Sequence, residues 1–235
     1  MPGNALTPLE LTGRAMTHVV TLHDPPFTLH AAVVEPFFRL RAAAAADGID
    51  LLPVSTYRDF SRQLGIWNAK CRGERDLFDR DGIRLDYDSL SEEEVVGAIL
   101  HWSALPGASR HHWGTEIDVV DARTAEPGRA PQLLPSEFAP GGRQASLETW
   151  LASNLGRFGF HRPYARDLGG VQPEPWHVSH SATAAAALAR FTPQLLQDAL
   201  DGVELDCAAI VRARLPEIFE RYVLNVELSP ETRLS

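Results

Sequence analysis

Apolar residues recur at helical spacing in several separate stretches of the chain. The first of these helices is predicted to begin near Glu35 and to end near Gly48. Pro36 favours that starting point, because proline is tolerated in the first turn of a helix and not in its interior. A second helix is predicted to begin after residue 58, with Asp59 or Ser61 near its N-cap.

The same spacing predicts further helices along the chain. Ser91 and Glu94 form a capping-box pattern, and the apolar positions behind them extend to Leu100. Helices are also expected over residues 147–158, 182–200 and 208–222. The chain is therefore predicted to contain several helices.

Short strands are expected between these helices. Residues 51–54 form a brief apolar run, and residues 115–120 alternate between apolar and polar side chains. Stretches rich in charge, Gly or Pro at 71–88 and 124–145 predict surface loops. Because helices and short strands mix without strict alternation, the predicted fold class is α+β, with a small antiparallel sheet flanked by several helices.

Chain length and composition favour a single domain. The chain has 235 residues, of which 44% are hydrophobic and 23% are charged, and single cores stop growing only near roughly 250–300 residues. This composition excludes an intrinsically disordered chain. We expect one domain over residues 1–235, with a motif-bearing core at about 29–181 and a helical C-terminal extension at about 182–235.

Charge and hydropathy exclude several classes of partner. The formal net charge of −9 gives no general attraction for nucleic acid. No apolar stretch of roughly 18 or more residues occurs, so no membrane span is expected. The N-terminus lacks a signal-peptide pattern, which favours a cytoplasmic location; a periplasmic one is the alternative if the export signal is missing from this sequence or unrecognised. Cys71 and Cys207 either pair with each other or stay unpaired, and the sequence does not indicate an oligomeric state.

Histidines and carboxylates gather in two segments of the chain. Hydrolysis of an amide by zinc needs three protein ligands, an open position for water, and a base that takes up the water's proton. In the first segment, residues 109–121, Ile117 and Val119 are expected to face the core. Glu116 and Asp118 then lie on the other, open face of the strand. Asp118 is therefore a candidate metal ligand.

Two neighbouring histidines are candidates to join Asp118. His112 lies six residues before Asp118, so an unbroken strand places both on one face. His111 lies seven residues before Asp118 and faces the other way, unless the chain bends between them. Gly114 is where such a bend or bulge would fall. Periodicity leaves the choice between the two histidines open.

The second segment, residues 173–180, contains Glu174 and His177. Pro175 holds Glu174 in an extended conformation and prevents a helix from continuing through this segment. A bend here can direct Glu174 and His177, which are three residues apart, at a common point. The arrangement suits a base and a ligand around one metal ion.

Three sequence motifs together resemble one family of enzymes. Two of them are Ser-x-His-x-x-Gly-x-x-x-Asp, at residues 109–118, and Glu-Pro-Trp-His, at residues 174–177. The third, at residues 57–63, is Tyr-Arg-Asp-x-x-x-Gln, in which Asp59 replaces the usual Ser. In this order the motifs resemble the VanY-type zinc D-alanyl-D-alanine carboxypeptidases, which are LAS-type peptidoglycan metallopeptidases. A second departure is Glu116, where the family often carries Ala.

The resemblance implies a set of ligands for one zinc ion per chain. His111, rather than His112, aligns with the first zinc ligand of the family. Asp118 aligns with the second ligand and His177 with the third. The small antiparallel sheet is then expected to carry the zinc site.

The resemblance also implies catalytic and substrate-binding residues. Glu174 aligns with the general base, and Arg58 aligns with the arginine that stabilises the oxyanion. Ser109, Gln63 and Tyr57 are the candidate substrate-binding residues, with a supporting role for Gln63.

The expected function is that of a zinc peptidase acting on peptidoglycan stem peptides, most simply as a DD- or LD-carboxypeptidase. An endopeptidase of the same family, cutting within the stem peptide, is the first alternative. A cation or hydroxyl cluster that binds a terminal carboxylate would separate these two, and the sequence does not locate one. The second alternative is a zinc-containing domain that binds wall peptides without cutting them, which has no need of Glu174.

Overall fold

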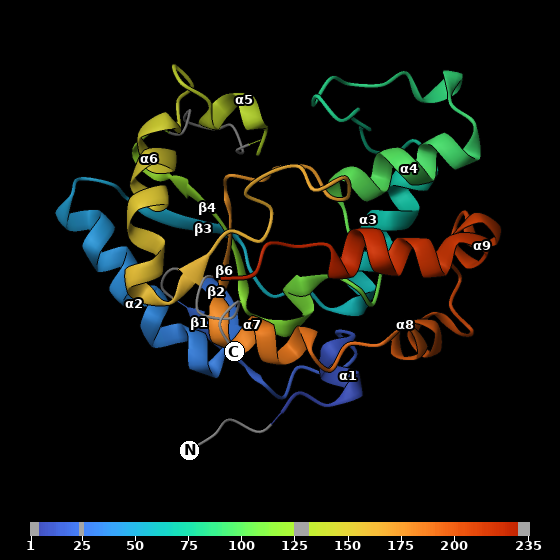
Figure 1. Ribbon diagram of the computed structural model, residues 1–235, viewed down its shortest axis with the longest axis horizontal. Coiled ribbons are helices and arrows are strands. Elements are labelled where there is room, and N and C mark those ends of the chain that lie inside the picture. Colours follow the sequence, from blue (N-terminus) through green and yellow to red (C-terminus); the bar gives the residue numbers. More distant parts are fainter. Residues whose placement is uncertain (1–4, 24–25, 125–131, 230–235) are drawn as a thin grey trace.

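The computed structural model describes residues 5–23, 26–124 and 132–229 of the chain. Figure 1 shows helices packed around small sheets, so the predicted α+β class is confirmed. None of the helices in these residues is both long and apolar enough to cross a membrane. The helices are α1 (Pro8–Leu11), α2 (Ala31–Ala46), α3 (Phe60–Cys71), α4 (Glu92–Trp102), α5 (Pro135–Phe138), α6 (Ala145–Asn154), α7 (Ser181–Leu188), α8 (Pro193–Leu200) and α9 (Ala208–Ile218). The strands are β1 (Val19–His23), β2 (Pro26–His30), β3 (Leu51–Ser55), β4 (Glu116–Asp121), β5 (Phe160–His161) and β6 (His177–His180).

The main sheet is antiparallel and has four strands in the order β3-β4-β6-β5. Its central pair, β4 and β6, is aligned so that Asp118 lies opposite His177. On the other side of β4, Ser55 of β3 lies opposite Asp118, next to an irregularity in the pairing. The register of the sheet therefore brings two of the predicted ligands together from distant parts of the chain.

Strands β1 and β2 form a separate antiparallel hairpin that the sequence analysis did not predict. The residues of β1 are exposed or half-buried without an alternating pattern, so apolar periodicity could not reveal the strand. The hairpin is tied to the motif segments by backbone hydrogen bonds. The His30 N–H donates to the Gly114 carbonyl oxygen at 2.8 Å, and the Tyr57 N–H donates to that of Thr28 at 3.0 Å.

Two hydrophobic clusters hold the elements together. One lies against the main sheet, where α2 and α6 contribute the fully buried Phe37 and Leu147. The other joins α3, α4 and the C-terminal helices around Trp67 and Ile99, which are also fully buried. Figure 1 shows α2 and α6 on the left and α3, α4 and α9 on the right, with β6 between them.

Two predicted helix starts are confirmed at the residues that the sequence indicated. Asp59 caps α3, and its Oδ1 accepts from the Arg62 N–H at 2.7 Å. Ser91 and Glu94 form the reciprocal capping box of α4, with hydrogen bonds of 3.3 and 2.8 Å. Asp caps a helix as well as Ser does, so Asp59 supplies a cap that a Ser at this position could also form.

The predicted start of α2 was wrong. The helix begins at Ala31, so Pro36 lies in its second turn and not in its first. The His30 side chain caps the helix, since its Nδ1 accepts from the Ala32 N–H at 3.1 Å. A cap supplied by His30 lies outside the usual Ser, Thr, Asp and Asn signals, which is why the pattern at Pro36 was misleading.

Two further predictions need correction. The helix predicted over 182–200 is two helices, α7 and α8, because Pro193 has no N–H to continue the first one. Thr192 instead caps α8, accepting from the Leu195 N–H at 3.2 Å. The loop predicted over 124–145 contains the short helix α5, and residues 125–131 of that loop lie outside the described part of the chain.

Candidate active site

His111 and Asp118 come together because the chain turns sharply between them. Residues Arg110–Trp113 form a 3-10 turn that ends at Gly114, whose φ of 67° lies in the left-handed region. A Cβ on Gly114 would lie 2.6 Å from the His30 backbone nitrogen, so only glycine fits here. After this turn, His111 Nε2 lies 3.4 Å from Asp118 Oδ2. The chain therefore bends between His111 and Asp118, which strand periodicity alone could not decide.

His112 points away from the site and is bonded to the backbone. Its Nδ1 donates to the Arg58 carbonyl oxygen at 2.6 Å, and its Nε2 accepts from the Gly107 N–H at 3.2 Å. Burial lowers the pKa of His112 to about 3, because a buried imidazole loses the hydration that favours its charged form. With both ring nitrogens bonded, His112 has a structural role, and His111 is the histidine at the site.

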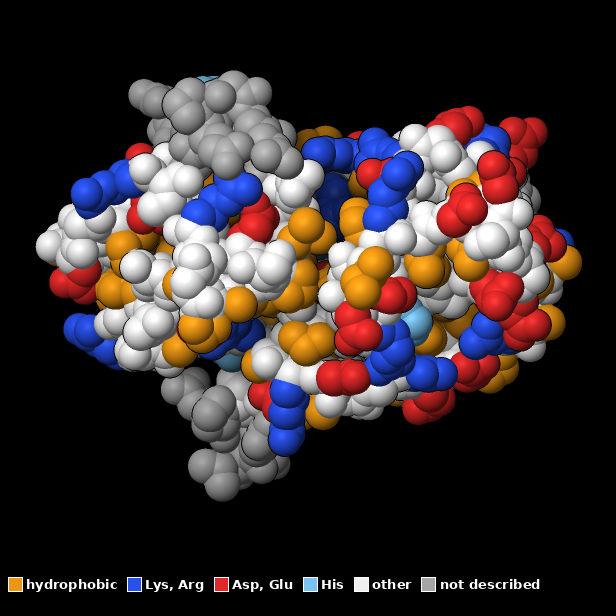
Figure 2. Space-filling model, turned by 90° about the horizontal axis from the view of Figure 1, so that it is seen from above, with side chains coloured by type: hydrophobic (Ala, Val, Ile, Leu, Met, Phe, Trp, Pro, Cys, Tyr) orange, Lys and Arg blue, Asp and Glu red, His pale blue; other side chains and the backbone are white. Residues whose placement is uncertain are grey.

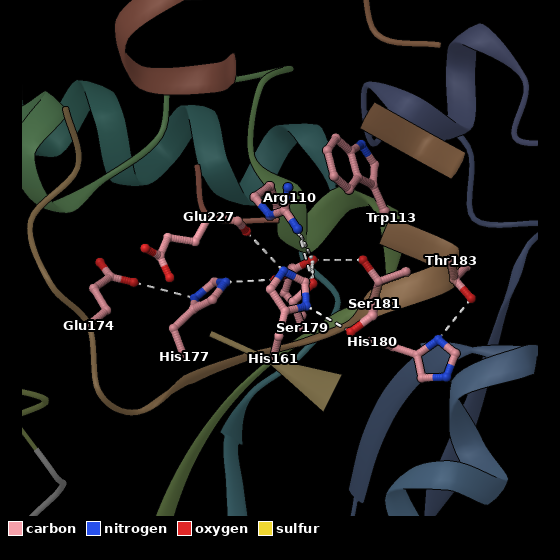
Figure 3. Close-up of polar contacts among 12 residues, drawn as sticks. Arg110, Trp113, His161, Glu174, His177, Ser179, His180, Ser181, Thr183 and Glu227 are labelled. Carbon is pink, nitrogen blue, oxygen red and sulfur yellow. Dashed lines mark hydrogen bonds and ion pairs between the residues drawn. The ribbon is translucent and has the colours of Figure 1, made fainter. Parts of the chain in front are cut away.

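A tight turn brings Glu174 and His177 to Asp118. Pro175 lies within this turn, and the His177 N–H donates to the Glu174 carbonyl oxygen at 3.1 Å. His177 Nδ1 then lies 3.0 Å from Asp118 Oδ1 and 3.3 Å from Glu174 Oε2. Figure 3 shows the Glu174 carboxylate pointing at the His177 ring. The turn thus directs a carboxylate and an imidazole at one point.

His111, Asp118 and His177 form a group that could hold a metal ion. One ligand atom from each lies within 4.8 Å of the others, and all three residues are buried. His111 Nδ1 donates to the Thr56 carbonyl oxygen at 2.7 Å, which leaves Nε2 free to bind an ion. Asp118 Oδ1 is buried without a hydrogen-bond partner in the described structure. Two imidazoles and a carboxylate with an unpaired oxygen fit a divalent transition-metal ion.

The carboxylates around His177 favour a positive charge at this point. Burial lowers the pKa of His177, but interactions with Asp118, Glu116 and Glu174 outweigh burial and raise the pKa well above its usual value. Burial raises the pKa of Asp118, and the two histidines more than reverse this, so that carboxyl group is ionised at neutral pH. The same surroundings that hold a proton on His177 would favour a metal cation in its place.

Glu116 lies behind His177 and fixes the orientation of its ring. Glu116 Oε2 accepts from His177 Nε2 at 2.8 Å, and Oε1 accepts from Arg110 at 3.1 Å. The hydroxyl groups of Thr115 and Ser179 donate to the same Oε1 at 2.9 and 2.8 Å. In Figure 3, Arg110 and Ser179 lie on the side of the His177 ring away from the base. With the Nε2 proton directed at Glu116, Nδ1 remains as the ligand nitrogen.

The expectation that Glu116 and Asp118 both lie on an open strand face was wrong for Glu116. All six residues of β4 are buried, and of these two only Asp118 lines the cavity. Glu116 is fully buried, and its charge is matched by Arg110, itself 5% exposed. A Glu at this position is therefore accommodated by an ion pair inside the protein.

The base and the predicted oxyanion residue lie in the same pocket. Burial raises the pKa of Glu174, although His177 and Arg58 act in the opposite direction. A raised pKa brings a carboxylate closer to the range suited to general-base work. Arg58 Nη1 donates to Gln63 Oε1 at 3.0 Å, and Gln63 Nε2 donates to the Ala104 carbonyl oxygen at 2.7 Å. Arg58 Nε is buried without a hydrogen-bond partner in the described residues, so the guanidinium keeps a free donor.

The side chains meet at a cavity of about 370 Å³. Of the predicted substrate-binding residues, Ser109 lies in its wall, whereas Gln63 and Tyr57 are not among the described lining residues. Gln63 is fully buried and holds Arg58, and the Tyr57 hydroxyl donates to the Ala15 carbonyl oxygen at 3.4 Å. The predicted catalytic and metal-binding residues all line the cavity: Arg58, His111, Asp118, Glu174 and His177.

Sequence reasoning missed several residues of this site. Tyr164 lines the cavity, its ring lies 5.0 Å from that of His177, and burial raises its pKa to about 12. It comes from a loop without any periodic pattern, so no signal marked it. Lys70 also lines the cavity, and here a signal was present, because it is the only lysine in the chain. Glu116 was noticed as a departure from the family pattern but was given no role.

The fold and this set of side chains define a hydrolytic site of the peptidase class. A family model for VanY, described as D-alanyl-D-alanine carboxypeptidase, matches residues 26–183. Since that match covers most of the chain, the protein belongs to the VanY family of peptidoglycan peptidases.

Relatives identified by sequence support this membership. A Haemophilus influenzae protein described as uncharacterized is 36% identical over 122 residues, which is 51% of this chain and 93% of that protein. A D-alanyl-D-alanine carboxypeptidase of Enterococcus faecalis is 27% identical over 157 residues, which is 65% of this chain and 48% of that enzyme.

Two solved structures share the fold. VanYB in complex with D-alanine-D-alanine has a TM-score of 0.53 and 20% identity, with 83% of this chain and 87% of that one covered. A variant of the vancomycin-resistance D,D-pentapeptidase VanY in complex with Zn(II) has a TM-score of 0.51 and 23% identity, with 78% and 89% covered. At these identities the likeness concerns the fold alone.

Proposed function

We propose that the protein is a zinc-dependent carboxypeptidase that hydrolyses peptide bonds in peptidoglycan stem peptides with DD or LD stereochemistry. The observation that carries the proposal is the convergence of His111, Asp118 and His177, whose ligand atoms lie within 4.8 Å of one another. Glu174 Oε2 lies 3.3 Å from His177 Nδ1, so a base stands directly beside this group. The VanY neighbour in complex with Zn(II) and the one in complex with D-alanine-D-alanine support the choice of metal and substrate.

One Zn²⁺ per chain would be held by His111 Nε2, a carboxylate oxygen of Asp118 and His177 Nδ1. This donor set of two imidazoles and one carboxylate is one that catalytic zinc sites use, with a further position left for water. When bound, such an ion supplies the Lewis acidity that peptide hydrolysis near neutral pH requires. The hydrogen bonds from His111 to Thr56 and from His177 to Glu116 hold both rings in the tautomers needed for binding.

The remaining chemistry falls to Glu174 and Arg58. Glu174, with its pKa raised by burial, takes the proton from the attacking water and later delivers it to the leaving amine. Arg58 stabilises the carbonyl oxygen as negative charge develops on it. Burial lowers the pKa of Arg58, and the carboxylates of Asp118 and Glu174 oppose this shift. Gln63 holds the guanidinium in place through the hydrogen bond at 3.0 Å.

The proposal is tested by mass spectrometry of defined muropeptides after incubation with the zinc-loaded protein. Loss of a single residue from the carboxyl end of the stem peptide is expected. Cleavage within the stem would instead support the endopeptidase alternative, and intact peptides would contradict the proposal. A chelator should abolish the activity and added zinc should restore it; hydrolysis that is indifferent to the chelator would contradict the metal requirement.

Replacing Glu174 tests the role of the base. Glu174→Gln keeps the size of the side chain but cannot take up a proton, so it should lower kcat by about 10²–10⁴-fold. Zinc affinity should remain within a few-fold of the wild type, because Glu174 is not among the three ligands. Both quantities are measured on the same preparation, by steady-state kinetics and by zinc titration. A Glu174→Gln protein with normal turnover would remove Glu174 from this role.

A further inference from the structure

Lys70 lies on the wall of the cavity although nothing in the proposed hydrolysis uses it. It is the only lysine in a chain with 22 Lys and Arg residues. Helix α3 presents Ile66 and Lys70, four residues apart and thus on one helix face, to the cavity. Figure 2 shows a hollow on this side of the molecule with Lys and Arg side chains at its wall.

The ammonium group of Lys70 has a hydroxyl partner and no carboxylate partner. Lys70 Nζ donates to Ser103 Oγ at 2.8 Å, and in the described part of the chain no Asp or Glu forms an ion pair with it. Two other basic residues of this region are paired: Arg72 contacts Asp206 and Arg80 contacts Asp167, each at 2.7 Å. An ammonium group with three donors therefore has hydrogen-bonding capacity left toward the cavity.

The wall of the cavity carries more positive charge than the proposed hydrolysis uses, since that reaction needs only Arg58. Arg58, Lys70 and Arg75 line it, and none of them has an ion-pair partner among the described residues. Asp118 and Glu174 are the acidic groups of the described wall, and both face His177. Burial lowers the pKa of Lys70 to about 8, the nearby Arg75 and Arg58 lower it too, and Glu174 alone opposes them. A bound anion would relieve this unfavourable environment.

The position of Lys70 relative to the base restricts which anion it can meet. Lys70 and Glu174 line the same cavity of about 370 Å³, so a ligand group held at Lys70 shares this cavity with the bond to be cut. In a carboxypeptidase substrate the terminal carboxylate belongs to the residue directly after that bond, and neighbouring Cα atoms are only about 3.8 Å apart.

We propose that Lys70, together with the Ser103 hydroxyl group, binds the free terminal carboxylate of the peptide and so restricts cleavage to the last residue. The inference rests on the proposed peptidase function and adds the residues that recognise the free carboxyl terminus of the substrate. It gives the chain the cation and hydroxyl pair that distinguishes a carboxypeptidase from an endopeptidase. Ser109 lines the same cavity and offers a second hydroxyl group.

The test compares two substrates that differ only at the terminus: an acyl-D-alanyl-D-alanine peptide with a free carboxylate and its carboxamide. For the peptide with the free carboxylate, Lys70→Met should lower kcat/KM about 10- to 100-fold, the size expected for loss of a charge-assisted hydrogen bond. Hydrolysis of the carboxamide should change less than threefold. Lys70→Arg, which keeps the charge, should restore part of the preference for the free carboxylate.

A matched control removes a positive charge from the same helix outside the cavity. Arg62 is exposed on α3 and is not among the described lining residues, so Arg62→Met should leave both substrates unaffected. An equal loss for both substrates in Lys70→Met, or no loss for either, would overturn the inference while leaving the peptidase proposal intact. If the wild-type protein hydrolyses neither substrate, the proposed function fails, and the following measurement still decides the role of Lys70.

The single lysine permits a measurement that does not depend on turnover. Among the amines of this sequence, an acetylating reagent can modify only Lys70 and the terminal amine, and mass spectrometry of digested protein separates the two. In zinc-loaded Glu174→Gln protein, the peptide with the free carboxylate should slow acetylation of Lys70 at least fivefold and leave the terminal amine unaffected. Its carboxamide, at the same concentration, should give no protection. Equal protection by both peptides, or protection by neither, would overturn the inference.

Discussion

Replacing Glu116 with Gln tests whether the carboxylate behind His177 sets the metal affinity of the site. Glu116 Oε2 accepts from His177 Nε2 at 2.8 Å, which directs the other ring nitrogen at the metal group. The amide oxygen of Gln can accept the same hydrogen bond, but it carries no negative charge to strengthen the ring as a ligand. The change also removes the carboxylate partner of Arg110, which is 5% exposed.

Two effects of different origin are expected from Glu116→Gln. Loss of the carboxylate behind a metal-binding histidine weakens metal affinity about 10- to 100-fold, which corresponds to about 1.4–2.8 kcal/mol. Loss of a buried ion-pair partner lowers the free energy of unfolding by about 3–5 kcal/mol. The lower end of that range is expected, because the Gln oxygen can still accept a hydrogen bond from Arg110.

The two effects are separated by measuring them on different states of the protein. Zinc affinity is obtained by competition with a chromophoric chelator, and the free energy of unfolding is obtained by urea titration of the metal-free protein. Glu148→Gln is the matched control. It removes a carboxylate on α6 that is paired with Arg162, and it should leave zinc affinity unchanged. A folded Glu116→Gln protein that binds zinc as tightly as the wild type would refute the reasoning.

Two more predictions concern Arg58 and His112. Arg58→Ala should lower kcat about 10²–10³-fold with little change in zinc affinity. Steady-state kinetics and zinc titration measure the two quantities, and a large loss of zinc affinity would contradict the role of Arg58 at the oxyanion. Burial holds the pKa of His112 at about 3 in the folded protein, against 6.5 ordinarily. Between these values the unfolded state binds more protons, so the stability that His112 contributes above pH 6.5 is lost as the pH falls toward 3. Urea titrations at several pH values give the slope of the free energy of unfolding against pH. His112→Gln should reduce that slope between pH 3 and 6.5, by up to about 1.4 kcal/mol per pH unit, and an unchanged slope would contradict a buried, neutral His112.

Local sequence signals predicted the parts of the fold that depend on local contacts. Asp59 and Ser91 start α3 and α4 because a side-chain oxygen within three residues meets free backbone N–H groups. The hairpin of β1 and β2 pairs residues within 19–30, and β2 alternates between buried and more exposed side chains. Strand β1 has no such alternation, so periodicity did not reveal the pair.

The candidate site was predictable in its members and not in its arrangement. Strand periodicity could not choose between His111 and His112, because the choice depends on a 3-10 turn ended by Gly114. The motifs indicated Glu174 and His177 together, and the structure brings them to within 3.3 Å. The partners of those residues are distant in sequence, and only the folded structure brings them together.

Glu116 shows the limit of reasoning from motifs. Its replacement of the family's usual Ala was visible in the sequence, but the meaning of the change depends on three other positions. Arg110, Thr115 and Ser179 all donate to Glu116 Oε1. Only their convergence turns a buried Glu from an unfavourable charge into a support for His177.

The central claim is that His111, Asp118 and His177 bind one metal ion beside Glu174. Anomalous diffraction from a crystal of the zinc-loaded protein, recorded on both sides of the zinc absorption edge, tests it most directly. The account predicts one strong anomalous peak per chain, about 2.0–2.1 Å from His111 Nε2 and His177 Nδ1 and about 2.0–2.2 Å from an Asp118 oxygen. A zinc peak at another place in the chain, or none at this group in a crystal that holds zinc, would contradict the claim.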